Sequence, residues 1–193
     1  MAEERGLPPG ARGDETIGLI PLGGLKREEL DFLPPAIREI VGLEAIWGPP
    51  LHLPRGAYRA GRRQYLASSL LQALAALPRE THLRLLGITD VDLYAPGLNF
   101  VFGQALMGGR ECVISVARLH PSFYGAPPEE VLFRDRVVKE AVHELGHTFG
   151  LEHCPDPNCV MRFSNSLADT DLKGRDFCAS CRRTLRRALG TGG

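Results

Sequence analysis

The chain has 193 residues, of which 44% are hydrophobic and 24% are charged, and its 23 basic and 23 acidic residues give a formal net charge of zero. These values are ordinary for one globular domain and exclude a largely disordered chain. A zero net charge provides no overall field that would favour nucleic acid or an anionic membrane. Residues 1–15 have no apolar core of the kind a secretory signal needs, and no run approaches 18 consecutive apolar residues. We therefore expect a soluble, cytoplasmic protein without a membrane partner.

The first third of the chain alternates strand-like and helix-like segments. Residues 1–14 are polar and are expected to form a loose lead-in to a single domain of residues 15–193. The apolar run Thr16–Leu22, which precedes two glycines, predicts a buried strand. Residues 26–42 have helical spacing, but a Pro-Pro pair interrupts them, which predicts two short helices. Leu43–Leu53 predicts a second strand interrupted near its Gly-Pro.

The middle of the chain continues this alternation. Arg62–Leu77 has apolar residues at helical spacing without an internal breaker, and predicts a helix. Three strand-like runs follow, over His82–Thr89, Leu98–Ala105 and Cys112–Leu119. A helix is then expected from Glu129 to Phe149, with Pro and Glu at its start and Gly at its end. The pattern predicts an α/β fold with a mostly parallel, mixed sheet.

The end of the predicted helix carries a metal-binding pattern, in the stretch "HELGHTFGLEHC". His143 and His147 are four residues apart, so their imidazoles project from one face of the helix, about a turn apart. Gly150 can adopt a positive φ and end the helix sharply, which would bring His153 back as a third ligand. Three nitrogen ligands leave a fourth position for water, which is typical of a catalytic zinc.

Glu144 directly follows the first histidine and is expected to lie beside the open position, where a carboxylate can take a proton from zinc-bound water. An alternative remains at this point. The same residues would also suit an amphipathic helix whose histidines pack in the core or face solvent.

Four of the five cysteines lie between the end of this stretch and residue 181, as two short pairs separated by 18 residues: Cys154, Cys159, Cys178 and Cys181. Such pairs are typical of a structural zinc held by four thiolates, although two disulfides or free thiols would also fit. In an extended segment consecutive side chains point to opposite sides, so His153 and Cys154 can serve different ions. The remaining Cys112 lies in an apolar run and is expected to be a buried core thiol.

Several segments together resemble the archaemetzincins, a branch of the metzincin metallopeptidases. The resemblance rests on "HELGHTFGLEHC", "CVM", "FSNS" and "FCASC", and on the upstream segments "FVFGQA" and "QYLASSLL". It implies a metzincin fold with a twisted mixed sheet, a backing helix, an active-site helix and a smaller C-terminal part. The upper subdomain would comprise residues 15–150 and the lower, zinc-stabilised subdomain residues 151–193.

The resemblance also implies roles for particular residues. It makes the three histidines ligands of a catalytic zinc, Glu144 the general base and the four cysteines ligands of a second, structural zinc. Met161 would form an apolar floor below the catalytic metal. A substrate peptide would extend along an edge strand, for which Leu98–Ala105 is the candidate. The candidate substrate-binding residues are Asn99, Phe100, Val101, Phe102, Gly103, Phe163 and Asn165. Apart from the resemblance, Tyr124 in the loop before the predicted active-site helix is a further candidate, which would reach the cleft and assist the oxyanion.

The leading hypothesis is therefore a monomeric zinc-dependent peptidase that binds two zinc ions and acts on a peptide or protein substrate, by internal or N-terminal cleavage. The alternative is a zinc-stabilised module that binds peptide or nucleic acid, because four arginines (182, 183, 186 and 187) follow the last cysteine pair. Cations near a helix C-terminus are favourable in any case, so a nucleic-acid partner is not expected. The isolated His52, His82 and His120 are expected to be packed or surface residues.

Overall fold

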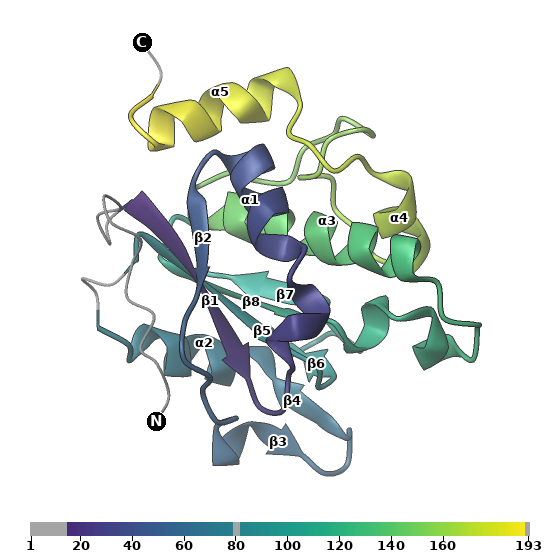
Figure 1. Ribbon diagram of the computed structural model, residues 1–193. Coiled ribbons are helices and arrows are strands. Elements are labelled where there is room, and N and C mark those ends of the chain that lie inside the picture. The colour runs from purple at the N-terminus through teal and green to yellow at the C-terminus, as the bar shows by residue number, and fades with distance from the viewer. Residues whose placement is uncertain (1–14, 79–81, 192–193) are drawn as a thin grey trace.

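The computed structural model describes residues 15–78 and 82–191, so the lead-in of residues 1–14 lies outside the described part. Its centre is a five-stranded sheet in the order β2-β1-β5-β8-β7 (Figure 1). Four of its strands run parallel, and β7 is antiparallel to β8. The strands are β1 (Thr16–Leu22), β2 (Glu44–Trp47), β5 (Arg84–Thr89), β8 (Glu111–Ser115) and β7 (Gly103–Ala105). The prediction of a mostly parallel, mixed sheet is confirmed.

Helices cover both faces of this sheet. Figure 1 shows α1 (Leu33–Val41) and α3 (Glu130–Thr148) on one face and α2 (Ala67–Ala75) on the other. The two faces correspond to two clusters of buried apolar residues, the larger between the sheet and α1 and α3. The two short helices predicted before the second strand are present, as a 3-10 helix (Arg27–Leu30) and as α1, which has proline in its first turn.

A second, three-stranded sheet corrects the sequence prediction for residues 62–77. It consists of β3 (Tyr58–Arg59), β4 (Gln64–Leu66) and β6 (Leu93–Tyr94), so the predicted helix loses its first turn to β4. The Gln64 side chain donates hydrogen bonds to the Asp92 carboxylate (3.0 Å) and to the Asn99 carbonyl (2.9 Å). These non-local contacts outweigh local helix propensity.

The strand predicted over Leu98–Ala105 is also shorter than expected, because only β7 at its C-terminal end is regular strand. The Asn99 carbonyl accepts hydrogen bonds from the side chains of Arg62 (2.9 Å) and Gln64. These bonds hold the first part of the segment beside Arg62 and Gln64, and it does not continue as strand. Val101 makes only an isolated bridge to Leu93.

The predicted strand over residues 112–119 ends early as well. β8 stops at Ser115 and a 3-10 helix (Ala117–Leu119) follows, with another at Pro121–Tyr124.

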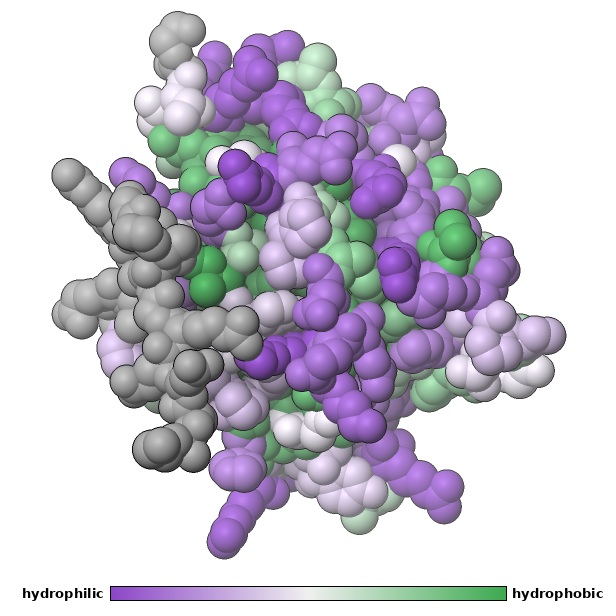
Figure 2. Space-filling model, viewed as in Figure 1, coloured by the Kyte–Doolittle hydropathy of each residue, from purple (hydrophilic) through white to green (hydrophobic). Residues whose placement is uncertain are grey.

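The part after α3 contains little regular structure, namely α4 (Leu167–Leu172) and α5 (Ala179–Ala188). Ion pairs join it to α3. Arg136 pairs with Asp171 (2.6 Å), and the fully buried Lys173 pairs with Glu140 (2.9 Å). Figure 2 shows that hydrophilic side chains predominate on the face viewed in Figure 1, with apolar ones visible mainly between them. No helix in the described ranges is long and apolar enough to cross a membrane.

Candidate active site

The end of α3 turns the chain back on itself. Gly150 has φ +81°, its N–H donates to the His147 carbonyl (3.0 Å), and the Leu151 N–H donates to the Gly146 carbonyl (3.1 Å). This pair of bonds is a Schellman motif, which requires a left-handed residue that glycine provides without strain. The reversal returns His153 to the side of the helix that carries the other two histidines.

The three histidines form one cluster whose candidate ligand atoms lie within 4.8 Å of one another. The Nδ1–H groups of His143 and His147 donate to the carbonyls of Val160 (2.8 Å) and Leu151 (2.7 Å). A carbonyl only accepts, so both rings direct an Nε2 lone pair into the cluster. The two Nε2 atoms are 3.1 Å apart, near the separation of about 3.3 Å that two nitrogens make on a tetrahedral zinc. Burial lowers the pKa of all three imidazoles, which favours the neutral form that binds metal.

Glu144 lies beside this cluster and is buried, with 6% of its surface exposed. Burial, and then the nearby Glu140 carboxylate, raises its pKa to about 8, while Lys173 acts in the opposite direction. A carboxyl group whose pKa lies near neutrality can both accept and return a proton, as general acid–base catalysis requires.

Met161 packs against the inner side of α3. It is fully buried, and its sulfur contacts the backbone of Gly146, where no side chain intervenes. Gly146 itself lies between the two helical histidines in the sequence. The Cys154 N–H donates to the Met161 carbonyl (3.0 Å), so the loop that carries His153 is tied to the methionine.

The four cysteines of the second pattern form a separate cluster, and their sulfur atoms lie within 4.8 Å of one another. All five cysteines are free, and the Cys154 and Cys178 sulfurs are 3.7 Å apart, too far for a disulfide. The Cys178 N–H donates to the Cys159 sulfur (3.3 Å), and the Cys181 N–H helps to lower the pKa of Cys178 to about 7. This favours the thiolate form of Cys178, the form that binds zinc, whereas burial raises the pKa of Cys159 and Cys181. His153 and Cys154 thus belong to different clusters.

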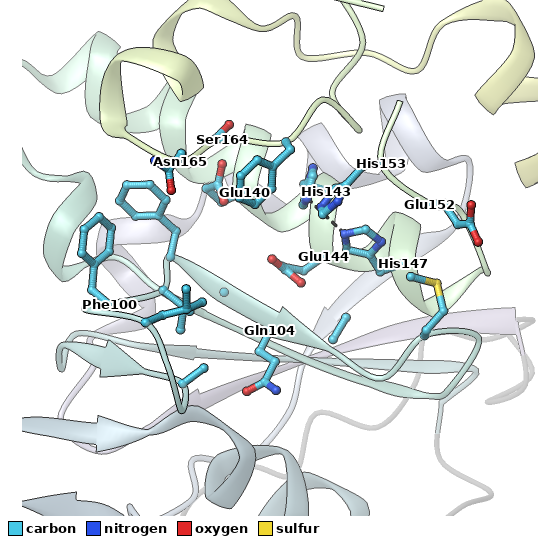
Figure 3. Close-up of a pocket in the computed structure, with 18 of the residues that line it drawn as sticks. Phe100, Gln104, Glu140, His143, Glu144, His147, Glu152, His153, Ser164 and Asn165 are labelled. Atoms are coloured by element: carbon cyan, nitrogen blue, oxygen red, sulfur yellow. Dashed lines mark hydrogen bonds between the residues drawn. The ribbon is translucent and has the colours of Figure 1, made fainter. Parts of the chain in front are cut away.

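A cavity of about 660 Å³ opens beside the histidines and Glu144. Figure 3 shows Phe100, Glu140, Ser164 and Asn165 toward one end and Glu152 beyond His147 at the other. Its lining includes Phe100, Val101, Phe102, Gly103, Phe163 and Asn165 of the predicted substrate-binding set.

Two residues of the predicted substrate-binding set lie elsewhere. Asn99 is not part of the lining, and its carbonyl is occupied by the two side chains described above. Tyr124 is also not part of the lining; it is 51% exposed and packs against the Phe123 ring (5.1 Å), so its role beside the oxyanion stays a prediction.

The edge of the main sheet faces this cavity. The Ser115 N–H donates to the Phe102 carbonyl (2.8 Å) and the Leu106 N–H to the Glu111 carbonyl (3.0 Å). Hydrogen bonding alternates along an antiparallel pair, so the main-chain groups of Gly103 and Ala105 point away from β8, toward the open edge.

Residues 50–187 match the model of Peptidase family M54. The chain belongs to Peptidase family M54. It is 45% identical over 184 residues to the archaemetzincin of Pyrococcus furiosus, covering 92% of this chain and 96% of that one. It is 55% identical over 141 residues to the archaemetzincin of Methanopyrus kandleri, covering 73% and 77%. The resemblance to the archaemetzincins is confirmed, and the chain is accordingly a zinc metallopeptidase.

Solved structures support the same M54 assignment. The crystal structure of the Methanopyrus kandleri archaemetzincin has a TM-score of 0.81 at 45% identity and covers 94% of this chain and 99% of that one. The Archaeoglobus fulgidus archaemetzincin, solved with malonate, has a TM-score of 0.76 at 40% identity, with coverage of 88% and 99%. The predicted fold class is therefore confirmed.

The residues lining the cleft of this M54 peptidase that sequence reasoning missed include two that form an ion pair, Glu140 and Lys173. Glu140 lies one turn before Glu144, on the same helical face, so its spacing of four was a usable signal. Lys173 carried no such signal, because its pairing with Glu140 spans 33 residues in sequence and depends on how α4 is placed. The isolated histidines behave as expected, with His82 bonded to Thr16 (2.8 Å) and His120 stacked on Phe133 (3.8 Å).

Proposed function

We propose that His143, His147 and His153 hold the catalytic zinc of a metzincin-type peptidase and that Glu144 is its general base. One observation carries this proposal. Three imidazoles converge beside the buried Glu144 carboxyl group in one cavity, and two of them, His143 and His147, use Nδ1–H to bond a main-chain carbonyl, which leaves Nε2 free to bind a metal. A zinc ion bound there supplies Lewis acidity and lowers the pKa of water to about 7. Glu144 takes the proton of the attacking water and passes it to the leaving amine.

The substrate is proposed to bind as an additional strand beside β7. The outward main-chain groups of Gly103 and Ala105 provide hydrogen-bond partners for an extended peptide, and backbone pairing is tolerant of sequence. Phe163, which is 57% exposed and packs against the His153 ring (5.0 Å), forms a wall of the cavity that contacts a side chain next to the scissile bond.

The four cysteines are proposed to hold a second zinc with a structural role, giving two zinc ions per chain. The fit is supported by four sulfurs in one cluster, by hydrogen bonds to two of them and by the absence of disulfides among the five free cysteines. Free thiols also support a reducing compartment, in line with a cytoplasmic location.

The test compares digestion of a mixed peptide pool by the zinc-loaded protein and by its Glu144→Ala variant, read by mass spectrometry. We expect cleavage to fall by about 10²–10⁴-fold in the variant, the usual contribution of a general base. Glu130→Ala, an exposed carboxylate at the far end of the same helix, is the matched control and should cleave normally. Equal cleavage by the wild type and Glu144→Ala would refute the role of Glu144. Peptides with blocked N-termini separate internal from N-terminal cleavage.

A further inference from the structure

The Glu144 side chain lies directly against the backbone of the edge strand. A Cβ atom built on Gly103 would be 2.6 Å from Glu144 Cγ, 2.8 Å from Cδ and 2.8 Å from Oε1. Real Cβ atoms essentially never come closer than 3.0 Å to another heavy atom. The place that the carboxylate occupies is therefore available only because residue 103 has no side chain.

The neighbours of a crowded glycine decide what a side chain there would displace. A Cβ at Gly174 would meet the main-chain carbonyl of Asn158, and one at Gly87 would meet the core side chains of Leu74 and Leu22. A side chain at either position would require the backbone or the core to move. At Gly103 the three nearest atoms are Cγ, Cδ and Oε1 of Glu144, a flexible side chain that has other rotamers available. The fold can accept a methyl group there by turning Glu144 away.

Hydrogen bonds do not fix the carboxylate against such a movement. Within the described ranges, none of the recorded hydrogen bonds or ion pairs involves the Glu144 carboxylate, which is held by packing between α3 and β7. Glu140, one turn earlier, is by contrast fixed by Lys173 and by the Thr170 hydroxyl, which donates to it (3.3 Å). The bare backbone of Gly103 is therefore a principal restraint on the position of the base.

We propose that Gly103 is a positioning residue for catalysis, whose missing side chain seats the Glu144 carboxylate against the strand that receives the substrate. This inference rests on the proposed function of Glu144 as the general base. The main-chain groups of Gly103 face the open edge while its Cα faces Glu144. One residue therefore fixes the position of the base relative to the strand that the substrate pairs with. Misplacing a catalytic group by about 1 Å can cost 10²-fold in rate.

The first test is Gly103→Ala, assayed for kcat, KM, zinc content and Tm. We expect kcat to fall about 10–100-fold. KM, zinc content and Tm should stay near the wild-type values, since the backbone groups and the metal ligands are unchanged. Gly24→Ala is the control, because a Cβ there meets nothing within 4 Å. An unchanged kcat, or a loss of kcat that is matched by loss of Tm or of zinc, would overturn the proposal.

A double-mutant cycle separates this idea from the role of Glu144 itself. Glu144→Asp shortens the side chain by one methylene, so Gly103→Ala should reduce kcat much less in that background than in the wild type. A crystal structure of Gly103→Ala should show the Glu144 carboxylate displaced by about 1 Å or more. Additive effects, or an undisplaced carboxylate, would refute the positioning role. If instead Glu144→Ala retained full activity, the proposed base would be wrong, whatever the position of its carboxylate in Gly103→Ala.

Discussion

The histidine cluster and the cysteine cluster are built in opposite ways. Two members of the histidine cluster come from consecutive turns of one long helix, so regular geometry sets their spacing before any metal is considered. The cysteine cluster takes its members from an irregular loop and from the start of α5, with 18 residues between Cys159 and Cys178 in the sequence. The regular helix sets most of the first cluster, whereas we propose that a zinc bound by the second cluster stabilises a segment with little other structure.

This difference matters for the active site because the segment that carries the cysteines, residues 151–181, supplies part of that site. His153 directly precedes the first cysteine, and the carbonyl that orients His143 belongs to Val160, which follows the second. The helix sets the spacing of the first two histidines, but the orientation of one and the delivery of the third depend on the cysteine segment.

Removal of the bound metal should have the largest effect and should separate the two regions. Zinc bound by a cysteine cluster contributes on the order of 10 kcal/mol to the folding of small zinc domains. After chelation we expect amides of residues 151–181 to lose protection from hydrogen exchange, while those within α3 keep it. Hydrogen-exchange mass spectrometry measures both in one sample, and equal protection of the two regions before and after chelation would contradict the comparison.

Breaking the buried ion pair between α3 and the segment that follows it should have the second-largest effect on stability. Lys173→Met leaves the Glu140 carboxylate buried without its partner, which costs about 3–5 kcal/mol. Urea unfolding should show this loss, and adding Glu140→Leu should recover most of it. The exposed Glu130–Arg134 pair is the control, since removing it should change the unfolding free energy by less than about 1 kcal/mol. An equally small effect of Lys173→Met would mean that the pair does not join the regions.

Gly146→Ala tests the contact of Met161 with α3 and should have a smaller effect. The new Cβ would overlap the Met161 sulfur and lie 3.2 Å from Phe177. Overpacking costs about 1–3 kcal/mol, which the better helix propensity of alanine offsets by roughly 1 kcal/mol. We expect a net loss of about 1 kcal/mol in thermal unfolding, and a gain in stability would show that the two regions are loosely packed here.

The C-terminal arginines should show the smallest effect. Arg183, Arg186 and Arg187 are exposed, so replacing all three by Gln should leave cleavage unchanged and alter unfolding by no more than about 0.5 kcal/mol. Arg182 differs, because it binds the Asp176 carboxylate and the Ile40 carbonyl and should be the more sensitive position. Salt-dependent nucleic-acid binding that the triple variant abolished would contradict this view of α5.

The sequence predicts the features that local spacing determines. The four-residue interval between His143 and His147, the glycine that ends α3 and the cysteine pairs are all local patterns, and the structure brings these residues together. The errors lie where contacts with residues distant in the sequence determine the local structure. Gln64 starts a strand because Asp92 and Asn99 bind its side chain, and Asn99 leaves the predicted edge strand for the same reason.

Lys173 was missed in the sequence for the same reason. Lys173 lines the cleft because it pairs with Glu140 on α3, and nothing near it in the sequence indicates a buried lysine. Gly103 lay within the predicted substrate-binding strand, but its contact with Glu144 becomes visible only when β7 is packed against α3.

The most direct test of the account is the zinc content of purified wild type, His147→Ala and Cys178→Ser, measured together with cleavage of the peptide pool. We predict two zinc ions per chain in the wild type, one in His147→Ala, and weakened binding at both sites in Cys178→Ser, with cleavage lost in both variants. Cys112→Ala, outside both clusters, should retain two. If Cys178→Ser kept one tightly bound zinc and full peptidase activity, the cysteine segment would not support the histidine site, and the central claim would be wrong.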